Sequence, residues 1–200
     1  MSRRTTTLSA LSAVALAVGG ALAVATPSAT AAPAAGAAAT STTAARCSTS
    51  GKTFRKVNTL NVPSRAVHTA RRLQTDAKDC DKRALVWRAT KDRTHLSYGF
   101  QTPAQAFAIP DRQERRYWYL AKALTIKPGT SKTEFATYKV WPRVATRLHA
   151  NKDAAWQELV TSGMYSQREV NAMRRSGIGY TGWRVGVSAG GRWVFDIAGD

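Results

Sequence analysis

The 200-residue sequence has few metal-ligating or nucleophilic residues, and none of them stands in a recognised catalytic motif. It contains three histidines and two cysteines, without an HExxH pattern or a CxxC pair, and the GxSxG motif of serine hydrolases is absent. Twelve scattered acidic residues disfavour a carboxylate-rich site for Mg²⁺ or Ca²⁺. His149 and Asp153 would share a helix face, but Asn151 between them is a predicted helix cap. We therefore predict no bound metal and no cofactor.

Long apolar runs are also scarce. The run over residues 8–24 is too short, and too rich in Gly and Ser, to predict a membrane span. Arg3 and Arg4 precede it and small residues at 29–31 follow it, an order typical of a secretory signal peptide over residues 1–31. We therefore expect a secreted, extracellular protein without a transmembrane segment. The arginine pair matches a twin-arginine signal in part, so both that route and the general secretory route stay open.

Acidic residues are also few. Lys and Arg number 30 against 12 Asp and Glu, and the net charge of +18 falls by two, to +16, without Arg3 and Arg4. Residues 32–46 are mostly Ala, Thr, Ser, Pro and Gly, which predicts a disordered tether. Residues 47–200 then form one basic domain, long enough to bury a core.

The two cysteines, Cys47 and Cys80, allow only one intrachain pairing. In an exported protein an even number of cysteines predicts a disulfide rather than free thiols. This bridge would join the start of the domain to the end of its first predicted helix.

We predict an α+β fold, a single domain with strands in the first half, a helical segment near 131–176 and a C-terminal β-hairpin. In the first half, apolar residues three to four apart predict a helix over 64–78. β-branched and aromatic residues predict strands over 84–89 and 96–100, followed by a helical turn over 103–108. Residues 116–126 fit either a strand or a helix, and their alternation favours the strand.

In the second half of the sequence, helix-capping patterns predict where helices begin and end. Residues 131–134 and Ser166–Glu169 match capping boxes, and Asn151 would cap a helix that buries Ala155, Trp156, Leu159 and Val160. Gly163 and Gly177 would follow the ends of the last two helices. In the C-terminal hairpin, keeping apolar residues on one face favours a three-residue loop over a two-residue turn. The expected pairs are Val187 with Trp193, Val185 with Phe195, Trp183 with Ile197 and Arg184 with Asp196.

Basic and aromatic residues alternate most densely at 112–122. Aromatic faces flanked by cations are typical of proteins that bind single-stranded nucleic acid or anionic glycans, although the same aromatic residues also suit a protein core. The sequence therefore predicts binding to an anionic extracellular polymer or cell-wall surface, with a cell-wall polymer, an acidic glycan or nucleic acid as the ligand. The candidate residues are Arg112, Arg115, Arg116, Trp118 and Lys122.

Two other functions remain open. A secreted hydrolase, such as a ribonuclease or phosphodiesterase, would need a histidine beside cations that stabilise the transition state. His95 near Lys91 and Arg93 is a weak candidate, and His68 is a weaker one. A secreted inhibitor of another protein would present a loop such as 101–113.

Overall fold

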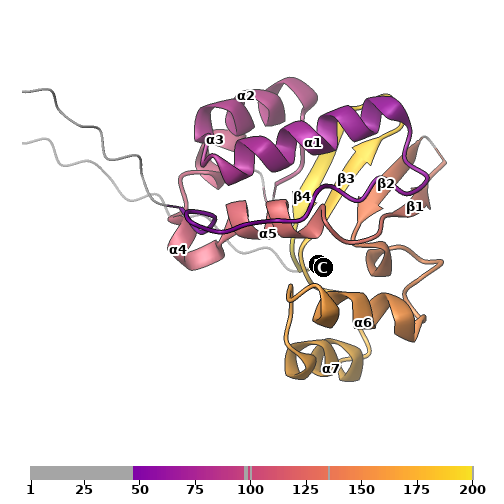
Figure 1. The fold of residues 1–200 in the computed structure, drawn as a ribbon. Coiled ribbons are helices and arrows are strands. Elements are labelled where there is room, and N and C mark those ends of the chain that lie inside the picture. The colour runs from indigo at the N-terminus through magenta and orange to yellow at the C-terminus, as the bar shows by residue number, and fades with distance from the viewer. Residues whose placement is uncertain (1–46, 97–98, 100, 135, 200) are drawn as a thin grey trace, which may run out of the picture. The chain divides into compact units, whose positions relative to one another are not determined.

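The structure is a computed structural model that describes residues 47–96, 99, 101–134 and 136–199. The predicted signal peptide over 1–31 and the tether over 32–46 lie outside these residues. Helices are combined with a four-stranded antiparallel sheet of order β1-β2-β3-β4, which confirms the α+β class (Figure 1). The strands come after the first five helices, so the prediction of strands in the first half is wrong. No helix in the described part of the chain is long and apolar enough to cross a membrane.

The elements follow one another in the order helices, hairpin, helices, hairpin. The helices are α1 (Ser64–Lys78), α2 (Lys82–Asp92), α3 (Pro103–Ala106), α4 (Asp111–Glu114), α5 (Arg116–Ala123), the 3-10 helix η1 (Arg143–Ala145), α6 (Asp153–Thr161) and α7 (Gln167–Arg175). The strands are β1 (Gly129–Lys132), β2 (Thr137–Trp141), β3 (Arg184–Ser188) and β4 (Trp193–Ile197).

Helix α1 confirms the prediction over 64–78, whereas α2 replaces the strand predicted over 84–89. The Asp81 side chain accepts a hydrogen bond from the backbone N–H of Ala84 at 2.8 Å and caps α2. Leu85 and Ala89 are four residues apart and both buried, so one helix face meets the core. The cap and this spacing outweigh the strand preference of Val86 and Trp87. Residues 97, 98 and 100 lie outside the described part, so the strand predicted over 96–100 is untested.

Residues 116–123 form helix α5, so the favoured strand is wrong and the helical alternative is right. Tyr117, Leu120, Ala121 and Leu124 are all buried and recur at helical spacing. The amide of Gln74 on α1 donates to the backbone oxygen of Ala121 at 3.2 Å, which joins the two helices.

A hairpin, rather than a capped helix, follows α5. Ser131 lies opposite Tyr138 and Lys132 opposite Thr137, so the capping box predicted at 131–134 is wrong. Long-range pairing overrides that local signal, because β2 is bonded on its other side to β3 and buries Val140. Only the 3-10 helix η1 forms after Pro142, which leaves Leu148 exposed.

The helical pair α6 and α7 confirms the later predictions. Ser166 and Glu169 form the capping box, with the Glu169 carboxylate accepting from the Ser166 N–H at 2.7 Å. Gly163 and Gly177 have φ of +71° and +74° just after the two helices, a conformation that glycine adopts without strain. Helix α6 begins one residue later than predicted, with Lys152 rather than Asn151 at its cap position.

The predicted register of the C-terminal hairpin is correct near the loop, and the observed register is shifted farther from the loop. Val187 pairs with Trp193 as predicted, but a bulge between Gly186 and Val187 places Gly186 opposite Phe195 and Val185 opposite Asp196. The expected pairs of Val185 with Phe195, Trp183 with Ile197 and Arg184 with Asp196 are therefore wrong. A Cβ at residue 186 would lie 2.3 Å from the Phe195 ring, so this register needs a glycine there.

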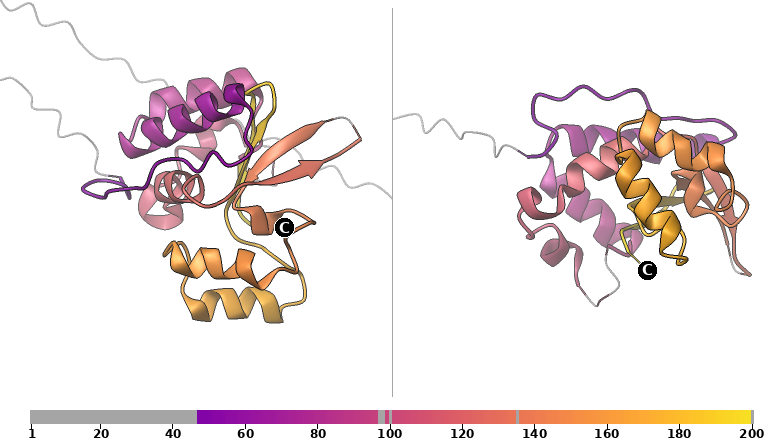
Figure 2. Two further views of the ribbon diagram at one scale, coloured as in Figure 1. Left: turned by 45° about the vertical axis from the view of Figure 1, so that its right-hand side comes forward. Right: turned by 90° about the horizontal axis from the view of Figure 1, so that it is seen from below.

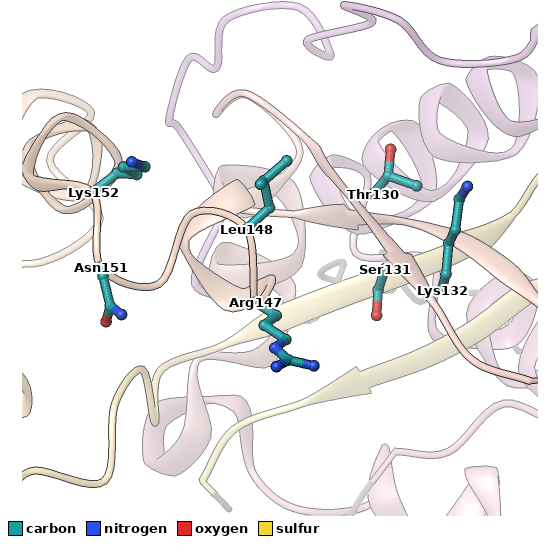
Figure 3. A pocket seen from close by; sticks show the side chains of 7 residues that line it. All are labelled: Thr130, Ser131, Lys132, Arg147, Leu148, Asn151 and Lys152. Atoms are coloured by element: carbon teal, nitrogen blue, oxygen red, sulfur yellow. The ribbon is translucent and has the colours of Figure 1, made fainter.

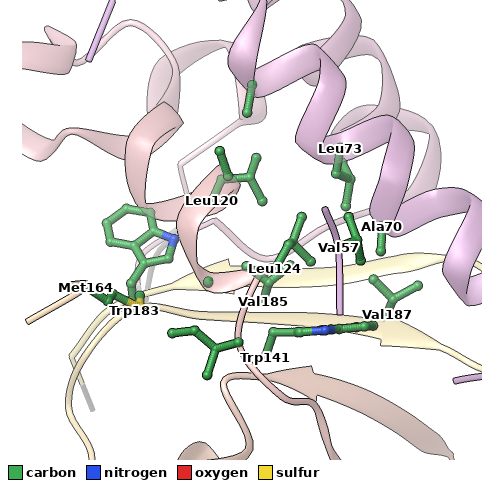
Figure 4. Packing of buried hydrophobic residues seen from close by; sticks show 14 of the residues in the cluster. Val57, Ala70, Leu73, Leu120, Leu124, Trp141, Met164, Trp183, Val185 and Val187 are labelled. Atoms are coloured by element: carbon green, nitrogen blue, oxygen red, sulfur yellow. The ribbon is translucent and has the colours of Figure 1, made fainter. Parts of the chain in front are cut away.

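Helices α1 and α5 contact β3, and side chains from all three fill the core. Figure 4 shows Leu73, Leu120 and Leu124 from the helical layer close to Trp141 and Val185 from the sheet. In the left view of Figure 2, α1 and α2 lie beside the upper part of the yellow strands, and the pair α6–α7 lies below the strands.

The N-terminal segment crosses α5 on its way to α1 (Figure 1). The predicted disulfide between Cys47 and Cys80 is confirmed and ties the start of this segment to the residues after α1. Further along, the Asn58 N–H donates to the Leu124 oxygen at 2.8 Å, and the Trp141 indole N–H donates to the Asn58 oxygen at 3.0 Å. The segment is thereby held beside α5.

Candidate cation and indole site

Three cations surround the half-buried indole of Trp118 on α5. The Arg115 guanidinium lies 4.5 Å from the ring centroid, and the ammonium groups of Lys52 and Lys122 each lie 5.9 Å from it. Contacts at these distances allow attraction between each cation and the negative face of the ring. Positive charges therefore surround the Trp118 ring, and part of the ring remains exposed to solvent.

Hydrogen bonds and the disulfide place Lys52 over this ring. The Trp118 backbone N–H donates to the Ser48 hydroxyl at 3.0 Å, and the Thr49 hydroxyl donates to the Ala77 oxygen at 2.9 Å. The Lys52 N–H closes the turn by donating to the Thr49 oxygen at 3.0 Å. The covalent bond at Cys47 thus fixes a turn that carries one of the cations.

No carboxylate lies within ion-pair distance of Lys52, Arg55, Arg115 or Lys122 among the described residues. Partial burial and the neighbouring positive charge of Arg55 lower the pKa of Lys122. An anion bound here would relieve that repulsion, so the charge arrangement favours negatively charged ligands.

A cavity of about 440 Å³ adjoins these cations. Arg55 and Lys122 line it together with hydroxyl-bearing residues and Phe54. The Thr125 and Ser162 hydroxyls donate to the backbone oxygens of Lys122 and Leu159. Arg55 and Lys122 are therefore the charged groups that line this cavity. We call Lys52, Arg55, Arg115, Trp118 and Lys122 the basic–aromatic surface.

Arg116, a predicted ligand-binding residue, faces the interior and is 4% exposed. Its guanidinium bonds to the Glu114 carboxylate at 2.8 Å and to the Leu96 oxygen at 3.1 Å, and lies 3.6 Å from the Asp196 carboxylate. A charge occupied in this way is not available to a polymer at the surface, which corrects the sequence-based assignment. Arg112 is exposed on α4, and no contact between its side chain and Trp118 is found among the described residues.

Asp196 completes the internal ion pair. The Trp183 indole N–H donates to one carboxylate oxygen, and the Arg116 guanidinium faces the other. Burial raises the pKa of Asp196 to about 6, while the positive charge of Arg116 opposes that rise. Asp196 is fully buried in the interior and is not part of the basic–aromatic surface.

The two candidate catalytic histidines, His95 and His68, lie at the surface. The backbone of His95 pairs with β4, its N–H donating to the Val194 oxygen at 2.9 Å, and its side chain is exposed. His68 is exposed on α1. Within the described residues, no hydrogen bond joins either imidazole to a group that would orient it. His149 lies 3.0 Å from the Thr146 hydroxyl, and the described chain contains no cluster of three potential metal ligands.

A larger cavity, of about 700 Å³, lies between β1 and the turn at 147–152. Lys132, Arg147 and Lys152 line it beside the exposed side chain of Leu148. In Figure 3 the charged ends of these three residues are spread around the cavity rather than meeting at one point. It therefore offers general positive charge, without the indole that marks the basic–aromatic surface.

Sequence reasoning missed Lys52 and Arg55, which lie about 60 residues before Trp118 along the chain. The signal that could have found them was the density of basic residues at 52–56, just after the first cysteine. Among the candidates taken from the sequence, Arg115 and Lys122 both lie over the Trp118 ring. No family model matches this chain, and the searches of curated proteins and of solved structures gave no match either.

Proposed function

We propose that this protein is exported and binds an anionic extracellular polymer through the basic–aromatic surface. The observation that carries the proposal is the convergence of Lys52, Arg115 and Lys122 on one indole, without a carboxylate in ion-pair distance among the described residues. The other cations described above differ from these three. Arg116 is paired with a carboxylate, and Lys132 lies apart from the other cations of its cavity.

A polymer suits this arrangement better than a single small anion. Each phosphate, sulfate or carboxylate of a polymer that contacts a Lys or Arg releases condensed counterions, so several weak contacts add up along the chain. The indole adds a flat face on which a base or a sugar ring can pack between the charges. The net charge of +16 that remains without Arg3 and Arg4 also attracts polyanions from a distance.

Two features support an extracellular location. The first 31 residues have the order of a secretory signal, and the disulfide between Cys47 and Cys80 is of the kind that persists in oxidising environments. The ligand is then a polymer of the cell wall or of the surroundings of the cell.

The test compares two triple variants that remove equal charge. Lys52→Ala/Arg115→Ala/Lys122→Ala removes cations from the basic–aromatic surface, and Lys132→Ala/Arg147→Ala/Lys152→Ala removes them from the larger cavity. Affinity for polyphosphate, measured across a salt series, falls for the first variant. The slope of log affinity against log salt decreases in magnitude by roughly 0.7 for each lost contact. Equal losses for the two variants, or binding indifferent to salt, would overturn the proposal.

A further inference from the structure

A shallow groove of about 540 Å³ lies between α7 and the residues just before β3, and Tyr119 of α5 lines it. Tyr119 is stacked against Trp183 with ring centroids 5.4 Å apart and planes inclined by 9°, and against Tyr165 at 5.7 Å and 27°. Trp183 is buried, whereas Tyr119 and Tyr165 are half-buried and form aromatic walls. We call this the aromatic groove. Its remaining lining residues are Glu114, Glu169, Ala172, Met173, Thr181, Gly182 and Ala198.

The charged side chains that line the groove are acidic rather than basic. Glu114 and Glu169, two of the twelve acidic residues in the sequence, both line it. Hydrogen bonds from Ser166 lower the pKa of Glu169, so this carboxylate is ionised at neutral pH. Glu114 is held at 2.8 Å by Arg116. Because the charge of Glu114 is balanced by Arg116, the repulsion that a phosphate or uronate would meet in the groove comes from Glu169.

The groove and the basic–aromatic surface are continuous. Trp118 and Tyr119 are neighbours on α5, with ring centroids 4.9 Å apart in an edge-to-face arrangement. The Arg115 guanidinium lies over both rings, at 4.5 Å from Trp118 and 6.0 Å from Tyr119. A ligand that crosses Arg115 therefore passes from a cationic, anion-attracting surface to an acidic, aromatic one.

We infer that the aromatic groove binds an uncharged sugar ring of an acidic glycan, while the charged group of the adjoining unit binds the basic–aromatic surface. This inference rests on the proposed function and names the class of its ligand. The exposed parts of Tyr119 and Tyr165 offer apolar surface that packs against the C–H groups of a sugar, and carboxylates accept hydrogen bonds from its hydroxyl groups. Most binding pockets combine such apolar walls with a few polar groups that fix orientation.

The alternation of charge separates this ligand from nucleic acid. A nucleic acid carries a phosphate at every residue, so a strand that followed both surfaces would bring negative charge next to Glu169. A glycan in which a uronate alternates with a neutral sugar places charge only where Lys52, Arg115 and Lys122 lie. The Glu169 carboxylate thus disfavours uniformly charged chains in the groove.

The test uses three probes on the mature protein: hyaluronan oligosaccharides, in which a uronate alternates with a neutral N-acetyl sugar, single-stranded DNA, and polyphosphate. Ala172→Phe blocks the groove from an exposed position, so folding is kept, and Tyr119→Ala removes the aromatic wall. Each variant is expected to lose about tenfold in affinity for hyaluronan, which corresponds to about 1.4 kcal/mol. Affinity for polyphosphate, which has no ring to pack, stays within about twofold.

The outcomes separate the groove from the basic–aromatic surface. If both groove variants bind hyaluronan as the wild type does, while the Lys52, Arg115 and Lys122 triple variant loses affinity, the groove inference is overturned and the proposed function stands. If the triple variant keeps its affinity for all three probes, the proposed function is overturned and this inference with it. Equal losses of DNA and hyaluronan binding in the groove variants would assign the groove to nucleic acid and overturn the sugar assignment. Melting temperatures equal to that of the wild type keep these comparisons valid.

Discussion

Arg115 and Arg116 are neighbours in the sequence and have opposite roles in the structure. Arg115 is exposed and lies over Trp118, with no carboxylate within ion-pair distance in the described part of the chain. Arg116 is buried and faces two carboxylates, Glu114 and Asp196. Arg115 stands between α4 and α5 with a φ of +53°, whereas Arg116 is the first residue of α5, so the backbone directs the two side chains into different environments. Basic residues counted from a sequence therefore do not all contribute to a binding surface.

Arg116→Ala gives the largest effect that this comparison predicts. It would leave the buried Asp196 carboxylate without its cation, and breaking a buried pair from one side costs about 3–5 kcal/mol. Arg115→Ala, an exposed substitution, should change the free energy of unfolding by no more than about 0.5 kcal/mol. Denaturant unfolding of the two variants measures the difference. Similar losses in both would mean that the two arginines are not distinguished as described.

Removing the disulfide should have the next largest effect. Replacing Cys47 and Cys80 by Ser is expected to lower the free energy of unfolding by about 2–5 kcal/mol, because the unfolded chain gains freedom. The same substitution frees the turn that carries Lys52, so affinity for polyphosphate should fall as well. The test is binding measured at a temperature where the variant is still folded. Unchanged affinity there would show that the turn keeps its place without the covalent bond.

The ionisation of Asp196, the buried partner of Arg116, should make the stability of the protein depend on pH. Its pKa is raised from 3.8 to about 6, so the native state holds the proton more tightly than the unfolded state does. Its contribution to stability is therefore complete below pH 3.8 and is lost as the pH rises through about 6, by about 3 kcal/mol. Asp196→Asn should abolish this component. The free energy of unfolding of the wild type, minus that of the variant, should fall between pH 4 and pH 7, whereas a constant difference would contradict the prediction.

Trp118→Ala should have the smallest effect on stability and a clear effect on binding. The indole is only half-buried, and stacking of a ring on an aromatic side chain contributes about 1–3 kcal/mol to binding. Affinity for single-stranded DNA or hyaluronan is therefore expected to fall while the melting temperature changes by a few degrees at most. A large loss of melting temperature without loss of affinity would place Trp118 in the core.

Local signals in the sequence were sufficient for part of this structure. The capping box of Ser166 and Glu169, the glycines after α6 and α7 and the spacing of Leu73 with its neighbours each act within a few residues, and all three predictions are confirmed. The disulfide followed from there being only two cysteines.

The errors arose where distant residues decide the outcome. Arg116 faces inward because Asp196, 80 residues away, is buried beside it. The hairpin register shifts because Phe195 covers Gly186, and residues 131–134 join a sheet whose other strands come later in the chain. Lys52 reaches Trp118 only because the N-terminal segment crosses α5. These contacts join residues far apart in the chain, so the pattern of residues within a short segment does not predict them.

Strand β1 forms one end of the sheet order, and this position bears on how the protein behaves at high concentration. An exposed sheet edge offers unpaired backbone groups to a second chain and so favours aggregation. Here the strand has four residues, ends at the exposed Lys132, and adjoins Arg147 and Lys152 across the cavity. Two copies approaching edge to edge would bring like charges together, so repulsion protects this edge. We therefore expect colloidal solubility to be highest at low ionic strength and to decrease as added salt screens these charges.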